Sequence, residues 1–336
     1  MFLFKLINKI KKKLSPEFKL DRKLLSEITE RYSKKPHQFK LIRQSNNYIF
    51  EVEPFEILRL SPSVHQSYET VLSELEWILF VHSHGVKVVK PLLSTAGKLV
   101  EKIEYGNDYY TAVLFEKAKG VEIGDKESTP DVFFKMGTLT GQLHAITKLY
   151  NPSPSVMPRK VWHSAEPDNV KKCLPAAENH LYGKFTNYLS VAMQNTQHRN
   201  NFGVVHNDIS RGNMLLNDGG LTLFDFEDCC YSWFVNDIAG IFYYVLLNNK
   251  KDIKENLEYL QHFMENFWRG YKSANQLNPD EIKYIPYWMG ARAIFIYAYL
   301  NKIWDFKNLE PHQKNYVGLN KLFVHYDFSE LSLKIP

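Results

Sequence analysis

The segment spanning residues 204–237 constrains the fold of this 336-residue chain more than any other part of the sequence. It starts with two β-branched residues and continues into a polar loop, in which His206, Asp208 and Asn213 follow the spacing H-x-D-x-x-x-x-N. A short apolar run then leads to Asp225, twelve residues after Asn213. This order predicts a rigid pair of strands with several polar side chains gathered at its mouth, followed by a helix.

The polar residue types in this segment suit the handling of a phosphoryl group. Such a group carries several negative charges, and Mg²⁺ neutralises them while taking oxygen ligands from carboxylates and amides. Asn213 and Asp225 can supply these ligands, and Glu227 is either a further ligand or a surface carboxylate. A separate carboxylate must align the acceptor hydroxyl and accept its proton, and Asp208 is the candidate for that role. His206 is expected to be structural.

Short β-branched and aromatic runs dominate residues 37–116 and predict antiparallel strands. The predicted strands cover residues 48–52, 56–60, 98–104 and 109–116. A helix near residues 66–84 interrupts the series, and the turn Gly106-Asn107-Asp108 joins the last two strands as a hairpin. This order predicts one compact lobe with a small sheet and a single helix.

Beyond Gly120 the pattern becomes mainly helical, with a β-rich insert at residues 203–225. The predicted helices cover residues 130–150, 179–198, 253–272 and 280–304. Thr129 is a favourable helix start, because its hydroxyl can accept a free backbone N–H and Pro130 gives up none that is needed. The chain is therefore predicted to be α+β, with a small antiparallel-sheet lobe joined to a larger, mainly helical C-terminal lobe.

The loop and several further motifs resemble the aminoglycoside phosphotransferase and choline kinase family, relatives of protein kinases whose catalytic loop reads like H-G-D-x-x-x-x-N before D-F-[DE]. Residues 45–52 are similar to the family's phosphate-covering turn, residues 57–60 to the strand that carries its phosphate-pairing cation, and residues 113–120 to its inter-lobe hinge. The resemblance covers about residues 35–245 in the same order and implies a two-lobed protein-kinase-like fold.

The resemblance implies an extension at residues 1–36, a nucleotide-binding lobe at 37–118 and a catalytic and substrate-binding lobe at 119–336. The implied nucleotide-binding residues are Ser45, Asn46, Asn47, Arg59, Glu74 and, through their backbone at the hinge, Glu116 and Ala118. Glu74 would pair with Arg59, with Glu69 and Glu76 as the other candidates. Many relatives carry Lys where this chain has Arg59, and a planar guanidinium would change the geometry of phosphate binding.

The implied function is an ATP- and Mg²⁺-dependent phosphotransferase that acts on a hydroxyl of a small molecule, either an aminoglycoside, choline or a homoserine-like acceptor. No glycine follows Phe226, which argues against a protein-kinase activation segment. The alternatives are a catalytically silent nucleotide-binding pseudokinase or scaffold and a kinase acting on protein serine or threonine. All the proposed Mg²⁺ and base positions are present, which weighs against the pseudokinase.

The acceptor is left open by the sequence. Aromatic residues in the helices after residue 240 could form core or could cage a quaternary ammonium group. Free carboxylates at Glu227 and Asp228 would favour a cation. Arg292 lies in an apolar helical stretch and needs a partner, either a structural Asp or the carboxylate of an amino-acid acceptor.

Charge and composition exclude several classes of protein. The net charge of +5 is spread along the chain, which is not typical of a nucleic-acid groove. Cys173, Cys229 and Cys230 form an odd, badly spaced set, which indicates reduced thiols and a cytoplasmic location.

Residues 1–14 predict a basic amphipathic helix that packs on the N-terminal lobe or makes weak membrane-surface contact. Stable membrane insertion is not expected, and the sequence carries no signal for the oligomeric state.

Overall fold

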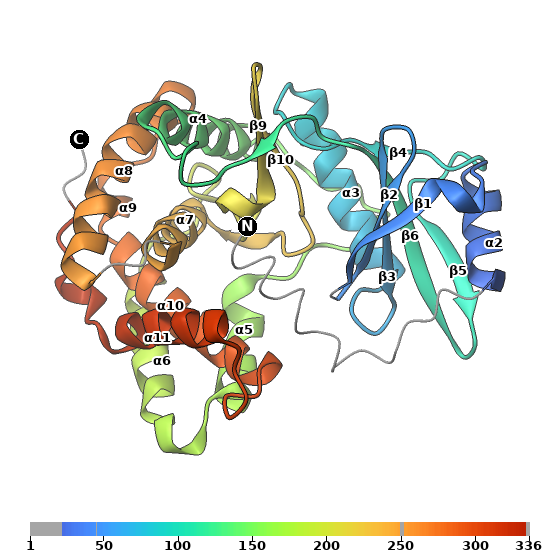
Figure 1. Ribbon diagram of the computed structural model, residues 1–336. Helices are drawn as coiled ribbons and strands as arrows, with labels where there is room; N and C mark the ends of the chain where they lie inside the picture. Colours follow the sequence, from blue (N-terminus) through green and yellow to red (C-terminus); the bar gives the residue numbers. More distant parts are fainter. Residues whose placement is uncertain (1–21, 45, 249–251, 334–336) are drawn as a thin grey trace.

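The computed structural model describes residues 22–44, 46–248 and 252–333, so the predicted helix at residues 1–14 and Ser45 lie outside the described residues. Figure 1 shows a smaller lobe, built on a sheet with α2 and α3, beside a larger lobe made mainly of helices. The predicted α+β, two-lobed arrangement is confirmed.

The smaller lobe is built on an antiparallel sheet of order β1-β2-β3-β6-β4, with β5 paired to β6. Its strands are β1 (Phe39–Gln44), β2 (Tyr48–Val52), β3 (Glu56–Pro62), β4 (Pro91–Leu92), β5 (Glu101–Tyr105) and β6 (Asp108–Glu116). The predicted strands correspond to β2, β3, β5 and β6. Strand β1 was not predicted because its central residues are exposed and show no apolar alternation. Gly106 has a φ of 64° in the turn between β5 and β6, where glycine avoids strain.

A helix covers each face of this sheet (Figure 1). The helices are α2 (Arg22–Arg31) and α3 (Tyr68–Ser83). Leu24 and Ile28, four residues apart, bury one stripe of α2 against the sheet, and the Tyr32 hydroxyl donates to the Ala112 carbonyl oxygen at 2.8 Å. Ser67 caps α3 through a hydrogen bond from the Thr70 N–H. Two residues of α3, Glu74 and Ile78, line the cavity between the lobes.

The larger lobe contains α4 (Pro130–Thr147), α5 (Trp162–Cys173), α6 (His180–Ala192), α7 (Phe234–Asn248), α8 (Ile253–Ala274), α9 (Pro279–Ile282), α10 (Ile285–Ile303) and α11 (Pro311–His325). The predicted helix at 179–198 ends earlier, at Ala192, because a polar stretch follows it. The predicted helix at 280–304 is divided into α9 and α10, with Pro286 in the first turn of α10. The sequence analysis did not predict α5 and α11, because apolar residues do not recur at helical spacing along the whole of either segment.

Helices α4 and α8 lie side by side in the larger lobe (Figure 1). A β-carbon at Gly137 would overlap the Phe267 carbonyl group, and one at Gly270 would overlap the Phe134 carbonyl group. The glycines therefore permit a backbone approach that larger residues would prevent. Within the described ranges, no helix is both long and apolar enough to cross a membrane. Cys173, Cys229 and Cys230 are free cysteines in the structure, and the latter two are buried.

Short strands carry the polar loop at the cleft. Strand β8 (Phe202–Val205) pairs with β11 (Cys230–Trp233), and β9 (Met214–Asn217) lies between β7 (Val121–Glu122) and β10 (Gly220–Leu223). The short 3₁₀ helices are Pro36–Gln38, Ala176–Glu178, Arg211–Asn213 and Phe328–Glu330. The loop thus begins at the end of β8, and Asp225 follows β10. The strands bring these two ends together, as the sequence predicted.

Candidate active site

The polar loop between β8 and β9 is anchored by His206, which is fully buried. Its Nε2 donates to the Phe224 carbonyl oxygen at 3.1 Å, and its Nδ1 accepts the N–H of Asp208 at 3.2 Å. Burial lowers the pKa of His206, so the ring is neutral at pH 7. His206 therefore joins the loop to the strand before Asp225, which fits the structural role expected for it.

A buried carboxylate, Asp237 on α7, holds the backbone of the same loop. Its Oδ1 accepts the N–H of Asn207 at 2.7 Å, and its Oδ2 accepts the N–H of His206 at 3.3 Å. His144 of α4 bonds Oδ2 through Nε2 at 3.1 Å. Burial is the largest single influence and opposes the charge on Asp237, but the hydrogen bonds from His144 and the Asn207 N–H, together with the nearby imidazoles, outweigh it, and the pKa of Asp237 lies below its usual value. The loop therefore rests on an ionised, fully paired carboxylate.

Asp208 has both carboxylate oxygens occupied by hydrogen-bond donors. The Tyr244 hydroxyl donates to Oδ1 at 2.7 Å, and Asn213 Nδ2 donates to Oδ2 at 2.7 Å and to the Asp208 carbonyl oxygen at 2.8 Å. Burial raises the pKa of Asp208, and both donors oppose that shift. A carboxylate held in this way can orient a hydroxyl and accept a proton late in a transfer.

Sequence reasoning missed Tyr244. A signal for it existed, because Tyr244 lies seven residues after Asp237 on α7 and so occupies the same helix face. Both side chains consequently reach the loop from one direction.

Asn213 and Asp225 present oxygens suited to a divalent cation. Asn213 is fully buried, and because its Nδ2 donates to Asp208, its Oδ1 is left with no hydrogen-bond partner. Burial, followed by the neighbouring Glu227 carboxylate, raises the pKa of Asp225 well above its usual range. An unpaired amide oxygen beside crowded carboxylates fits a hard cation with oxygen ligands. In the described part of the chain no three His, Cys, Asp or Glu side chains form a metal cluster, so nucleotide phosphates would have to complete the shell.

Arg59 and Glu74 form a bidentate pair between β3 and α3. The two Arg59 Nη atoms lie 2.8 and 2.9 Å from the two Glu74 carboxylate oxygens, and both side chains are buried. Glu69 is exposed, and Glu76 instead accepts the backbone N–H of Ser153 at 2.9 Å. Among the three candidate carboxylates, Glu74 is therefore the one that contacts Arg59. This pair holds a guanidinium beside the cleft in a fixed orientation.

A cavity of about 460 Å³ separates the lobes at this point. Among the residues that line it are Ile49, Ile57, Arg59, Glu74, Val89, Phe115, Glu116, Ala118, Leu215 and Asp225. Apolar side chains form the wall nearest the hinge residues Glu116 and Ala118, whereas Arg59 and Asp225 lie at the polar end. An apolar slot that ends in charged groups suits a flat base joined to a phosphate chain.

Asn46 and Asn47 reach across the cleft from the N-terminal lobe. The side chain of Asn46 hydrogen-bonds the Tyr299 hydroxyl of α10, and Asn47 Nδ2 donates to Glu227 Oε2. The predicted phosphate-covering residues therefore contact the C-terminal lobe directly. Glu227 binds this turn in the present structure, whereas its role as a metal ligand stays a prediction.

The carboxylates beyond Asp208 give the open side of the cleft a negative character. Asp228 is exposed, yet desolvation by the protein around it, and after that the Glu227 carboxylate, raise its pKa to about 7, while Lys160 and Arg159 act in the opposite direction. Arg292 does not face this space. It is 2 % exposed, and its guanidinium contacts Asn207 rather than the Asp that was one of its two expected partners.

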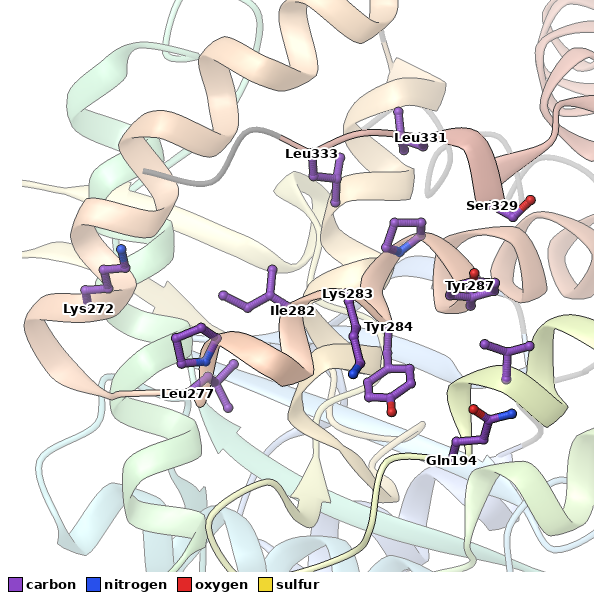
Figure 2. Close-up of a pocket in the computed structure, with 13 residues that line it drawn as sticks. Gln194, Lys272, Leu277, Ile282, Lys283, Tyr284, Tyr287, Ser329, Leu331 and Leu333 are labelled. Carbon is purple, nitrogen blue, oxygen red and sulfur yellow. The ribbon is translucent and has the colours of Figure 1, made fainter.

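A larger cavity, of about 700 Å³, lies elsewhere in the C-terminal lobe (Figure 2). Its lining includes Gln194, Lys272, Ile282, Lys283, Tyr284, Tyr287, Ser329 and Leu333. None of the predicted site residues lies among those that line it. Size alone therefore does not identify the active site, because the smaller cavity is the one lined by Arg59, Glu74 and Asp225.

Comparison with known proteins agrees with this arrangement. A family model described as "Phosphotransferase enzyme family" matches residues 40–275. An amicoumacin kinase of Bacillus subtilis (strain 168) is 28 % identical over 299 residues, which cover 88 % of this chain and 89 % of that protein.

Two solved structures are similar over most of their length. An amicoumacin kinase in complex with AMP-PNP, Ca²⁺ and Ami has 25 % identity and a TM-score of 0.83, over 94 % of this chain and 98 % of that one. A microcompartment-associated aminopropanol kinase has 17 % identity and a TM-score of 0.70, over 90 % of this chain and 95 % of that one. The second likeness concerns the fold alone.

Proposed function

Because the chain belongs to the phosphotransferase enzyme family, we propose that it transfers the γ-phosphoryl group of ATP, with Mg²⁺, to a hydroxyl of an amine-bearing small molecule. The observation that carries this proposal is the placement of Asp208, whose carboxylate is fixed by Tyr244 and Asn213 at the edge of the inter-lobe cleft. An oriented carboxylate beside a nucleotide-sized cavity is what transfer to a hydroxyl requires.

Each side chain of the cleft has a proposed role. Asp208 orients the acceptor hydroxyl and accepts its proton as the new oxygen–phosphorus bond forms and the bond from the γ-phosphorus to the bridging oxygen breaks, which releases ADP. Asn213, through its unpaired Oδ1, and Asp225 would hold the cation, with Glu227 as a further candidate ligand. Mg²⁺ supplies charge neutralisation at the phosphate oxygens when it is bound. The phosphate-pairing role belongs to Arg59, oriented by Glu74.

The remaining nucleotide contacts follow from the lining of the cavity. Glu116 and Ala118 would meet the adenine base through their backbone, next to apolar side chains. Ser45, Asn46 and Asn47 would cover the phosphates, and Ser45 lies outside the described residues. For Asn46 and Asn47 this role requires their present contacts with Tyr299 and Glu227 to be exchanged for phosphate oxygens.

The charge of the cleft supports a cationic acceptor. Asp208, Glu227 and Asp228 place carboxylates on one side, and an ammonium group of the acceptor would relieve the repulsion between them. The homoserine-like acceptor loses its main support, because the Arg292 guanidinium is buried against Asn207 and does not face the cleft. Amicoumacin is the first candidate, since two of the similar proteins are kinases named for it.

Transfer from radiolabelled ATP tests the proposal. The purified protein would be incubated with Mg²⁺ and, separately, with amicoumacin, aminopropanol, choline, homoserine and an aminoglycoside. We expect label to pass to a cationic compound that has no carboxylate, and not to homoserine, whose carboxylate would meet the negative side of the cleft. Efficient labelling of a folded protein, with no small hydroxyl compound accepted, would contradict the proposal and favour a protein kinase.

A further inference from the structure

Arg292 is a buried cation that forms no salt bridge among the described residues. It lies on α10 among apolar residues and is 2 % exposed. Its charge nevertheless acts on the Asp208 carboxyl, whose pKa it lowers against the larger effect of burial. Removing a charge from water is costly, so a buried guanidinium must be compensated by other contacts.

The compensation comes from one residue of the catalytic loop and from aromatic rings. Arg292 Nη2 donates to Asn207 Oδ1 at 2.7 Å, and Nη1 donates to the Asn207 carbonyl oxygen at 3.3 Å. The guanidinium carbon lies 5.4 Å from the ring centre of Trp162 and 5.7 Å from that of Phe295, both within the range of cation–π attraction. Both Nη atoms of Arg292 therefore donate to the same residue, Asn207.

Asn207 has an unusual backbone and immediately precedes Asp208. Its φ of 68° lies in the left-handed region, which asparagine tolerates better than most residues but which still needs support. Asp237 accepts its N–H at 2.7 Å, while Arg292 occupies its carbonyl oxygen and its side-chain oxygen. Asn207 Nδ2 also donates to the Asp228 carbonyl oxygen at 3.4 Å, but the shortest contacts of this residue come from the two buried charges, Asp237 and Arg292.

We propose that Arg292 is a positioning residue: by holding Asn207 in its left-handed conformation, it fixes the direction in which the adjacent Asp208 carboxylate points. The inference rests on the proposed phosphotransfer function, for which Asp208 is the base. Arg292 is not among the residues that line the nucleotide cavity, and it reaches Asp208 in two ways: through its hydrogen bonds to Asn207 and through its charge, which lowers the Asp208 pKa and which Arg292→Lys preserves. A base displaced by about 1 Å can lose on the order of 100-fold in rate.

Kinetics with ATP and amicoumacin, or with whichever acceptor the labelling assay identifies, test the inference. Arg292→Met should lower kcat by about 100-fold while the KM for ATP changes by less than about threefold. Arg292→Lys should recover part of that loss, because one ammonium can reach only one of the two oxygens. The matched control is Ile294→Ala on the same helix, where a fully buried side chain is truncated away from the loop. That control should lower the melting temperature and leave kcat within about twofold.

A double-mutant cycle separates positioning from general stability. Asn207→Gly keeps a residue that adopts positive φ without strain but removes the side-chain oxygen that Arg292 binds. If Arg292 acts through Asn207, the double variant should turn over about as fast as Arg292→Met alone. If the fold loss of kcat in the double variant instead equals the product of the two single fold losses, the residues act independently and the inference is overturned. Should Arg292→Met fail to fold, the same cycle is run with Arg292→Lys.

Amide hydrogen exchange tests the inference without relying on the proposed activity. In the full chain, Arg292→Met or Arg292→Lys should speed exchange in residues 204–214 beyond the change seen for Ile294→Ala. If the wild-type protein transfers phosphate to no compound, the proposed function fails, yet this exchange result still reports whether Arg292 holds the loop. Unchanged exchange and unchanged kcat in a folded Arg292 variant would overturn the inference.

Discussion

The hydroxyl of Tyr244 donates a 2.7 Å hydrogen bond to Oδ1 of Asp208, so a residue of α7 helps to fix the proposed catalytic carboxylate. Tyr244→Phe removes this donor and keeps the aromatic ring. Since hydrogen bonds to charged groups contribute about 1.5 to 3 kcal/mol, we expect kcat to fall by roughly 10- to 100-fold with the KM for ATP unchanged. A variant with normal kcat would show that Tyr244 is only a packing residue.

The Arg59–Glu74 pair should control both stability and nucleotide binding. Glu74→Ala leaves a buried guanidinium unpaired, and we expect a loss of about 3 to 5 kcal/mol in the free energy of unfolding together with weaker ATP binding. Glu69→Ala is the matched control, because Glu69 is an exposed carboxylate on the same helix. Chemical denaturation and calorimetric titration measure the two effects. If Glu74→Ala and Glu69→Ala had the same stability and the same ATP affinity, Glu74 would have no role in the site.

Asp225 should be dispensable for stability in the nucleotide-free protein but required for metal binding. Asp225→Asn relieves repulsion from Glu227 and also removes the 3.4 Å ion pair with Arg43, so we expect the melting temperature without ligand to change little. The same variant should lose the stabilisation that ATP with Mg²⁺ gives the wild type, which is about 2.7 kcal/mol at 100 times the Kd. EDTA should abolish that stabilisation in the wild type. A full ATP-dependent shift in Asp225→Asn would exclude it as a cation ligand.

The buried His144 predicts a loss of stability in mild acid. Burial lowers the pKa of His144 below 6.5, so the unfolded chain takes up a proton near pH 6.5 while the folded chain does not. The unfolded state thus binds more protons there, and the free energy of unfolding should decrease as the pH falls below about 6.5. Denaturation at pH 7.5 and 5.5 measures this, and His144→Gln should show a smaller difference. An identical pH dependence in His144→Gln would refute the assignment.

The parts of the site that are close together in the sequence were the most predictable. Asp208, Asn213 and Asp225 lie within one strand–loop–strand segment, so their spacing already indicated that they would meet. The family resemblance drawn from these motifs is confirmed by the family model. The strands β2, β3 and β6 were equally clear, because β-branched and aromatic residues mark them.

Contacts that depend on how helices pack could not be predicted from the sequence. The choice of Glu74 over Glu69 and Glu76 depends on the rotation of α3, which the sequence constrains only loosely. Arg292 lies 85 residues from Asn207 in the chain, and only the packing of α10 behind the loop shows that an asparagine, not an aspartate, is its partner. The break between α9 and α10 also escaped prediction, because apolar residues continue across it.

The most direct test of the central claim is single-turnover phosphate transfer by the wild type and Asp208→Asn, with ATP, Mg²⁺ and the acceptor found in the labelling assay. The account predicts that Asp208→Asn binds ATP with unchanged affinity but transfers phosphate about 10² to 10⁴ times more slowly, because the carboxylate acts on the acceptor hydroxyl and not on the nucleotide. Transfer by Asp208→Asn at nearly the wild-type rate would contradict the account.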